Sequence, residues 1–254
     1  MKRRNLLFLL PNLFTVSSIF CGVYAVVLAT DGSIPDRFLR AGVAILFGVL
    51  FDTMDGRVAR MTKTESDFGI QLDSLADVIT FGVAPAILVY KWALVPLGIV
   101  GVMVAFVFAT CGALRLARFN VMATKNVKSS PHFVGLPIPL GAAGIVALVL
   151  LHHHLGGGPV GMTPAVVLTV LIISALMVSR IRYRTFKKVK ASGRALPLLI
   201  GLVAGVAVAS YFTGFGLIFA LLWGGWVAFG MAEEVWRLFR RALHARASGG
   251  EDEK

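Results

Sequence analysis

Four stretches of this chain contain no Asp, Glu, Lys or Arg, and they are too long for the surface of a water-soluble domain. They run from Asn5 to Thr30, Trp92 to Leu114, Ser129 to Ser179 and Ala195 to Ala232, which is 26, 23, 51 and 38 residues. A helix needs about 20 apolar residues to cross the hydrocarbon core of a bilayer. With 57% hydrophobic and only 15% charged residues, the chain is predicted to be an all-α integral membrane protein.

Glycine, proline and short polar segments divide these apolar stretches into separate helices. Gly156 to Pro159 interrupts the longest run, and Thr213 with Gly214 divides the last one. We predict a polytopic helical bundle of about eight transmembrane helices, over residues 13–30, 38–59, 69–90, 93–115, 136–153, 162–180, 195–212 and 215–236. Together they form a single membrane domain, with an interfacial segment before it and a basic, then acidic, cytoplasmic tail after it: 13–236, 1–12 and 237–254.

The basic residues lie almost entirely in alternate connections between the predicted helices. The chain has 25 Lys and Arg against 13 Asp and Glu, a net charge of +12. Only Arg37, Arg40 and Lys91 fall on the side opposite the other 22. Because cytoplasmic loops carry such an excess of Lys and Arg, both termini are expected in the cytoplasm. The charge is spread over loops that face lipid headgroups, so we expect no nucleic-acid partner.

Four aspartates interrupt otherwise apolar helical segments. Asp52 and Asp55 are three residues apart, and Asp73 and Asp77 are four apart, so each pair shares one face of its helix. The two helices run antiparallel through a cytoplasmic turn, which brings both pairs to about 6–12 Å below the helix ends. A carboxylate inside a membrane costs about 2.5 kcal/mol or more, so these groups should face the bundle interior.

Four carboxylates at one depth repel each other unless cations neutralise them. One possibility is a structural cluster that shares protons or pairs with Arg57 and Arg60. The interpretation we favour is a site for hard divalent cations, because all-oxygen ligands suit Mg²⁺, Mn²⁺ or Ca²⁺. Two such ions stabilise the attacking and leaving oxygens in phosphoryl transfer. Gly56 and Ala59 leave room beside the aspartates for a phosphate-bearing ligand, or simply for close helix packing.

Read together, these residues resemble the signature of the CDP-alcohol phosphatidyltransferase family. All eight fixed positions are present with their spacings: Asp52, Asp55, Gly56, Ala59, Arg60, Gly69, Asp73 and Asp77. Further stretches are similar to the phosphatidylserine synthase branch of that family: Pro11–Thr15, Ala76–Pro85, Leu114–Asn120, Gly135–Pro139 and Ser179–Arg184. The family resemblance is specific over residues 50–90, and the resemblance to the branch extends more loosely over 10–190.

The resemblance implies that the membrane domain transfers the phosphatidyl group of CDP-diacylglycerol to the hydroxyl of L-serine and releases CMP. It implies that two divalent cations, Mg²⁺ or Mn²⁺, are bound by Asp52, Asp55, Asp73 and Asp77. Asp77 would also be the catalytic base for the acceptor hydroxyl. The residues expected to bind the CDP-lipid are Asn12, Thr15, Asp52, Gly56, Ala59, Arg60, Gly69 and Asp73.

A serine acceptor needs cations for its carboxylate, and the 155 residues between Asp77 and Glu233 contain no acidic side chain. A planar guanidinium suits carboxylate recognition, although each such residue could instead be a positive-inside anchor. The candidates at cytoplasmic helix ends are Arg115, Arg118, Asn120, Arg180 and Arg182. The resemblance further implies a homodimer in the cell (cytoplasmic) membrane, among membrane lipids, with its active site facing the cytoplasm.

Three alternatives remain open from the residues. The acceptor could be another alcohol, such as glycerol 3-phosphate or inositol phosphate, and the donor could be an ether lipid. A protein of a different class, an ion-coupled transporter, could also use intramembrane aspartates. Transporters tend to show repeated halves with sites near the midplane, whereas these aspartates lie in one hairpin near one face.

Overall fold

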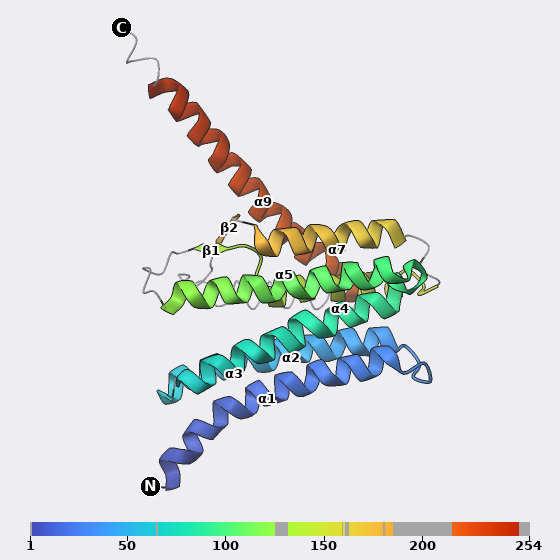
Figure 1. Ribbon diagram of the computed structural model, residues 1–254, viewed down its shortest axis with the longest axis vertical. Helices are drawn as coiled ribbons and strands as arrows, with labels where there is room; N and C mark the ends of the chain where they lie inside the picture. Colours follow the sequence, from blue (N-terminus) through green and yellow to red (C-terminus); the bar gives the residue numbers. More distant parts are fainter. Residues whose placement is uncertain are drawn as a thin grey trace.

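Helices make up nearly all of the part of the chain that the computed structural model describes, which is residues 2–64, 66–124, 132–158, 160, 163–179, 181–184 and 215–248. In chain order they are α1 (Lys2–Thr30), α2 (Arg37–Thr62), α3 (Asp67–Asp77), α4 (Ala84–Val89), α5 (Ile99–Thr124), α6 (Ile138–His154), α7 (Thr163–Val178) and α9 (Phe215–Ser248). Figure 1 shows α1, α2 and the helix containing α3 and α4 side by side, with α5 and α7 beyond α4. The expected helix over 195–212 lies outside the described residues.

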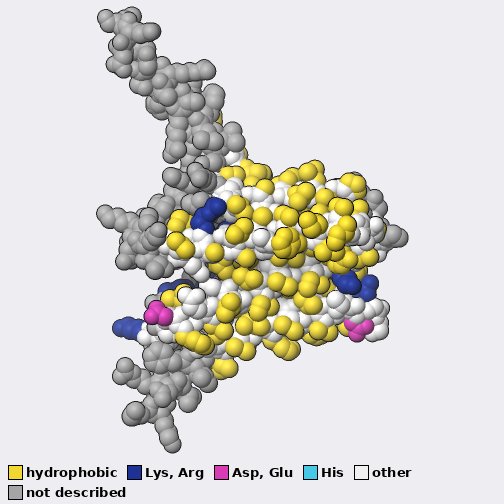
Figure 2. Space-filling model, in the orientation of Figure 1, with side chains coloured by type: hydrophobic (Ala, Val, Ile, Leu, Met, Phe, Trp, Pro, Cys, Tyr) yellow, Lys and Arg dark blue, Asp and Glu magenta, His cyan; other side chains and the backbone are white. Residues whose placement is uncertain are grey.

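Within these described residues, four helical stretches are long and apolar enough to cross a membrane. They are Leu10–Thr30, Asp67–Leu97, Ile99–Met122 and Phe215–Glu233, while α6 and α7 are shorter apolar helices. Figure 2 shows the corresponding surface, a broad apolar band with Lys, Arg, Asp and Glu side chains at its two ends. The protein is therefore a helical membrane protein, and the total of eight spans and the cytoplasmic termini stay predictions.

The first helix passes through Pro11 without ending. Proline lacks an N–H and its ring crowds the carbonyl one turn earlier, so it kinks a helix that continues through it. Figure 1 shows the first turns of α1 bent away from the rest of the bundle. The expected segment 1–12 is thus part of the same helix as the first span, and its place at the membrane surface stays a prediction.

One continuous helical stretch covers residues 67–97, so the predicted break between helices 69–90 and 93–115 is wrong. After α3 come a π-helical turn η1 (Val78–Val83), α4, a second π-helical turn η2 (Tyr90–Leu94) and a 3₁₀ turn η3 (Val95–Leu97). Lys91 and Trp92 lie inside this stretch rather than at its end. The chain turns instead at Gly98, whose φ of 56° is open to glycine and costly for other residues.

A short two-stranded sheet, which the sequence did not indicate, joins the start of α6 to the end of α7. Strands β1 (His132–Val134) and β2 (Arg182–Arg184) pair antiparallel, with Phe133 opposite Tyr183. After β1 the chain needs a glycine, because Gly135 has a φ of 78° and donates its N–H to the Ile181 carbonyl at 2.8 Å. Figure 1 places this sheet at the end of the bundle where α3 begins.

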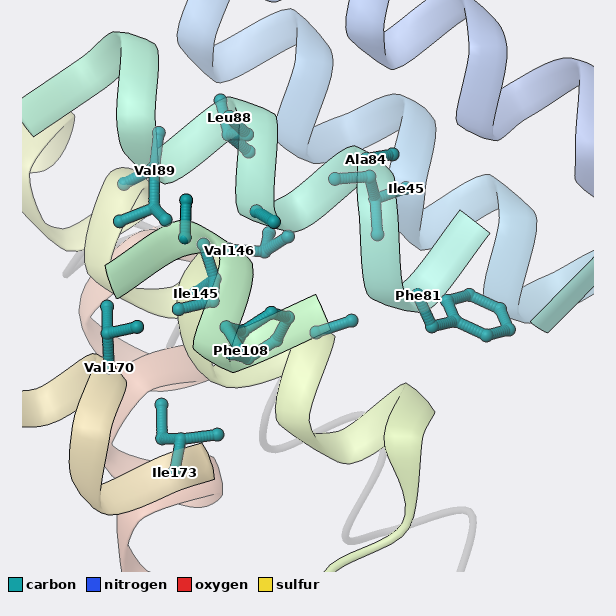
Figure 3. Close-up of a cluster of buried hydrophobic side chains, with 14 of the residues drawn as sticks. Ile45, Phe81, Ala84, Leu88, Val89, Phe108, Ile145, Val146, Val170 and Ile173 are labelled. Carbon is teal, nitrogen blue, oxygen red and sulfur yellow. The ribbon is translucent and has the colours of Figure 1, made fainter. Parts of the chain in front are cut away.

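The apolar core lies where the long helix 67–97 meets α2, α5, α6 and α7 (Figure 3). Its fully buried side chains include Ile45, Leu88, Phe108 and Ile145, each from a different one of these helices. Between helices in a membrane, such contacts stabilise mainly through close packing rather than through exclusion of water. Helix α9 is attached to α6 by a hydrogen bond from Trp223 Nε1 to the Leu140 carbonyl, 2.7 Å long.

Three helices, α1, α2 and the stretch 67–97, meet at Thr80, which is fully buried. Its hydroxyl donates to the Ser18 carbonyl at 2.9 Å, and the Ser18 hydroxyl donates to the Gly48 carbonyl at 3.2 Å. A Cβ added at Gly48 would lie 2.5 Å from Thr80 Cγ2, and one at Gly22 would lie 2.8 Å from Thr80 Cα. Glycine at both positions therefore permits the approach. Asp52 lies one turn beyond Gly48, and Asp77 one turn before Thr80, so this Thr80 contact sets the register between the two aspartate pairs.

Replacing Gly48 by alanine should destabilise the protein, because the new Cβ overlaps Thr80 Cγ2 and overpacking of this kind costs about 1–3 kcal/mol. The expected result is a lower Tm in detergent. Adding Thr80→Ser, which removes Cγ2 and keeps the hydroxyl, should restore most of the loss. Gly225→Ala on α9 is the matched control, since an added Cβ there has no heavy atom within 4 Å among the described residues. An unchanged Tm for Gly48→Ala would contradict the tight contact.

Candidate functional site

Helix α2 presents two aspartates one turn apart, close to the end where it meets α3. Asp55 is buried and Asp52 is half-buried, in a helix whose remaining surface at this level is largely apolar. The Thr15 hydroxyl of α1 donates to Asp55 Oδ2 at 2.7 Å. A carboxylate that accepts a short hydrogen bond from a buried hydroxyl is fixed in orientation, so Asp55 is held by α1 as well as by its own helix.

Helix α3 presents the second pair toward the first. One carboxylate oxygen from each of Asp52, Asp55 and Asp73 lies within 4.8 Å of the other two. Asp77 is one turn further along α3, and its carboxyl group contacts that of Asp52. The structure therefore brings all four predicted aspartates together, from two antiparallel helices.

Asp77 is unusual among the four in its surroundings. Its Oδ1 is buried, and among the described residues it has no hydrogen-bond partner. The cation that interacts with it is Arg115 of α5, which is 7% exposed. Arg115 lies over the Phe119 ring at 5.4 Å, and its Nε also lacks a partner in the described part of the chain. A buried, unpaired acceptor and a buried, unpaired donor thus lie near each other beside the aspartate cluster.

The turn between α2 and α3 is held by a capping serine and leaves space next to α1. The Ser66 hydroxyl accepts from the Gly69 N–H at 3.1 Å, which is the usual N-cap contact of a helix. A Cβ at Gly69 would lie 3.2 Å from Ser66 Oγ and 3.6 Å from Asn12 Oδ1. An alanine here would crowd the Ser66 hydroxyl and would lie in contact with Asn12.

On α2, the two small residues of the predicted ligand site lie beside Arg60. A Cβ at Gly56 would lie 3.5 Å from one guanidinium nitrogen of Arg60, so that side chain folds back over the glycine. Arg60 is exposed and interacts electrostatically with Asp55, while Ala59 is half-buried. The arrangement places one cation at the rim of the acidic cluster, over Gly56.

The five candidates for acceptor binding fall into three groups. Arg115 faces the cluster, as described, and Asn120 Nδ2 donates to Ser74 Oγ of α3 at 2.9 Å. Arg118 is exposed and donates to the Val178 carbonyl at the end of α7, at 2.9 Å. Arg180 lies outside the described residues, and of Arg182 only the backbone, in β2, is described.

Two connections to the site were not indicated by the sequence. Ser74, between Asp73 and Asp77 on α3, ties that helix to α5 through Asn120. Thr80 of η1 and Ser18 align the helical stretch 67–97 with α1 and α2. Ser74 and Thr80 are each three residues from Asp77 in an otherwise apolar helix, and this pattern could have indicated both connections.

The donor set suits a hard divalent cation. Mg²⁺ binds oxygens at about 2.1 Å and Ca²⁺ at about 2.3–2.6 Å, so oxygens on opposite sides of one ion lie about 4–5 Å apart. The 4.8 Å limit for Asp52, Asp55 and Asp73 agrees with this spacing, and Asp77 Oδ1 has a free lone pair beside them. The acidic cluster can therefore hold metal.

Comparisons with known proteins agree with this chemistry. A sequence model of the family described as CDP-alcohol phosphatidyltransferase matches residues 8–179, which include every element of the aspartate site. A protein of Helicobacter pylori (strain ATCC 700392 / 26695), named CDP-diacylglycerol--serine O-phosphatidyltransferase, is 40% identical over 227 residues, or 86% of this chain and 92% of the relative.

Two further relatives are similar over a shorter part of the chain. One from Bacillus subtilis (strain 168), with the same name, is 35% identical over 182 residues, covering 70% of this chain and 92% of its own. One from Methanothermobacter thermautotrophicus, named archaetidylserine synthase, is 37% identical over 176 residues, covering 68% and 69%. The matched region and these identities show that the chain belongs to the CDP-alcohol phosphatidyltransferase family.

Proposed function

We propose that this protein transfers the phosphatidyl group of CDP-diacylglycerol to the hydroxyl of L-serine, giving phosphatidylserine and CMP. The observation that carries the proposal is the meeting of Asp52, Asp55, Asp73 and Asp77 beside the buried cation Arg115. The names of the relatives support the same reaction. An ion-coupled transporter has no support from the family match.

The aspartates would hold two divalent cations, Mg²⁺ or Mn²⁺, as the family resemblance implies. Asp52, Asp55 and Asp73 offer converging oxygens for one ion, and Asp77 with its neighbours would share in the second. When bound, such ions neutralise the diphosphate of the CDP-lipid and the charge that develops on the CMP leaving group.

The donor would lie along α2 and the start of α3. Gly56 and Ala59 leave the helix surface open, Gly69 leaves room next to Asn12, and Arg60 is placed to reach a phosphate. Thr15 supports the site by orienting Asp55. In this position the diphosphate is at headgroup depth while the acyl chains stay in the leaflet.

Asp77 would remove the proton from the serine hydroxyl. As that proton leaves, the serine oxygen attacks the phosphorus that carries the diacylglycerol, and the bond from this phosphorus to the CMP oxygen breaks. Proton removal by a positioned base contributes about 10²–10⁴-fold to such reactions. The buried Oδ1 of Asp77, which lacks a protein partner within the described residues, supports this role.

Arg115 would bind the carboxylate of serine. It is buried, close to Asp77 and without a hydrogen-bond partner at Nε within the described residues, so an acceptor held by it would have its hydroxyl near the base. Asn120 would contribute from the same helix, and Arg180 and Arg182 remain candidates from the segment after α7. Arg118, whose guanidinium donates to the Val178 carbonyl, would act mainly by positioning the end of α5 against α7.

The relatives agree more closely on the acceptor than on the donor. Their names share serine, whereas the lipid part is diacylglycerol in two of them and archaetidyl in the third. The serine assignment therefore has the wider support, and assays should include both a diacyl and an ether-linked CDP-lipid.

We further propose the placement that the charge pattern implies, in the cell membrane with both termini and the aspartates on the cytoplasmic side. Cysteine accessibility at the exposed Met61, beside the cluster, and at the exposed Ser33, at the other end, would test this orientation. The homodimer that the resemblance implies would have about twice the 27.2 kDa mass of the chain in detergent.

Transfer should depend strictly on a divalent cation, because the four carboxylates have too few local cations to neutralise them. Purified protein would be assayed with CDP-diacylglycerol and serine, with CMP and phosphatidylserine measured by mass spectrometry. Chelation should abolish product formation, and Mg²⁺ or Mn²⁺ should restore it. Full turnover in excess EDTA would refute the metal site. Release of CMP with another alcohol but not with serine would show that serine is not the acceptor.

Asp77→Asn should lower kcat by at least about 10²-fold, since it removes the base, while weakening CDP-lipid binding much less. Asp52→Asn should instead weaken both metal and CDP-lipid binding. Calorimetric titration beside turnover separates the two effects. Asp67→Asn, an exposed aspartate in the first turn of α3, is the control and should behave like wild type. Near-normal turnover by Asp77→Asn would assign the base to another group.

Arg115→Ala should raise the KM for serine about ten- to 150-fold, from the loss of a charge-assisted hydrogen bond worth about 1.5–3 kcal/mol. Arg115→Lys keeps the charge without the planar fork and should be partly impaired. Arg57→Ala, an exposed arginine on α2, is the control. For the wild type, ethanolamine should be a poor acceptor because it lacks the carboxylate. Equal use of serine and ethanolamine would overturn the assigned role of Arg115.

A further inference from the structure

An apolar cavity lies between α1 and α2, on the outward face of these helices. It has a volume of about 650 Å³, and most of its wall consists of apolar side chains. Leu13, Val16 and Phe20 of α1 form one side, and Phe47 and Phe51 of α2 belong to the other. All of these except Phe51 are at least 50% exposed, so the groove is open toward the membrane.

The groove is long enough for a lipid chain. Along α1 its lining extends from Leu13 to Leu28, a rise of about 22 Å at 1.5 Å per residue. One leaflet of a bilayer contributes about half of the 30 Å hydrocarbon core, or about 15 Å. The groove is therefore long enough to hold an acyl chain over the full depth of one leaflet.

The two ends of the groove differ in charge. Arg40, the charged residue among its lining, lies at the end where α2 begins. The aspartates are at the other end, since Asp52 is twelve residues further along α2, about 18 Å away. Tyr24 lies at the same end as Arg40 and stacks on Phe20, with ring centroids 6.0 Å apart.

Arg40 is also one of the three basic residues that depart from the charge bias of the chain. Arg37, one turn earlier, is engaged with its own segment, since its guanidinium lies 4.7 Å from the centre of the Phe38 ring. The exposed Arg40 instead lines the end of an apolar groove. A cation at the end of an acyl-sized groove, with Tyr24 in the same half of the lining, is complementary to a phospholipid with a negative headgroup.

We propose that this groove binds one anionic glycerophospholipid from the leaflet farther from the aspartates. Its phosphate contacts Arg40, and one acyl chain runs along α1 and α2 toward Phe51. This lipid is not the substrate, because its headgroup lies at the opposite end of the groove from the acidic cluster. Its binding holds α1 against α2 in the half of the bundle where the Thr80 contact does not reach.

The test is lipid retention by the purified full chain in native mass spectrometry, with dioleoylphosphatidylglycerol as the probe. The wild type should retain one lipid, and dioleoylphosphatidylcholine, whose headgroup carries its own cation, should bind roughly fivefold more weakly. Arg40→Gln should weaken retention of phosphatidylglycerol by a similar roughly fivefold factor, and Arg40→Lys should largely preserve it. Lys91→Gln removes a charge at the same end outside the groove lining and should change nothing.

A second pair of variants tests the acyl part of the groove. Val43 lines the groove and Val83 does not, yet each is 38% exposed. Val43→Trp should reduce lipid retention at least fivefold, whereas Val83→Trp should not, and neither should change the KM for CDP-diacylglycerol more than twofold.

Three results would overturn the proposal. If Arg40→Gln retained as much phosphatidylglycerol as the wild type, the proposed contact between Arg40 and the headgroup would be refuted. A raised KM for CDP-diacylglycerol in Val43→Trp with unchanged lipid retention would make the occupant the substrate chain. Loss of a dimer in Val43→Trp with unchanged lipid retention would make it a second copy of this chain.

Discussion

The mutual repulsion of four carboxylates within an apolar bundle is the constraint on which the rest of this structure depends. Each of these groups costs free energy in a membrane, and bringing them together raises that cost further. The helices that carry them must therefore be held firmly by contacts that involve no charge. The Thr80 contact, with glycines on both neighbouring helices, supplies such a connection one turn away from Asp52 and Asp77.

Two arginines beside the cluster offset part of its negative charge. Arg115 is buried next to Asp77, and Arg60 lies at the rim of the cluster, so the aspartates have cations on two sides. Neither cation fills the centre, where the oxygens of three aspartates converge. The proposed roles follow the same separation. Helices α2 and α3 would face the diphosphate, and α5 carries Arg115, which would recognise the acceptor.

Spacing along the sequence predicted the aspartate cluster well because the relevant geometry is local. Residues three or four apart share a helix face, and a short turn between two helices makes them antiparallel neighbours. Both conditions involve residues 52–77 only. The family match covers residues 8–179, so it also includes the helices before and after this pair.

Features that join distant parts of the chain could not be predicted in the same way. The hydrogen bond from Asn120 to Ser74, that from Arg118 to the Val178 carbonyl, and the pairing of β1 with β2 each depend on how the helices pack. The end of the helix at Gly98 was also missed, because Lys91 and Trp92 look like residues at a membrane surface. Backbone hydrogen bonding continues past them into the 3₁₀ turn that contains Pro96, and the chain turns at Gly98.

The π-helical turn after Asp77 has a consequence for how one helix can serve both the site and the core. In this turn the Ala84 N–H donates to the Ile79 carbonyl five residues back, which accommodates about one extra residue and rotates the later part of the helix by roughly 100°. The direction in which the aspartates face, toward α2, is thereby set separately from the direction in which Leu88 faces, toward the core. Deleting a single residue from this turn would leave the four aspartates and Leu88 in place in the sequence. It would still rotate either the aspartates away from α2 or Leu88 away from the core.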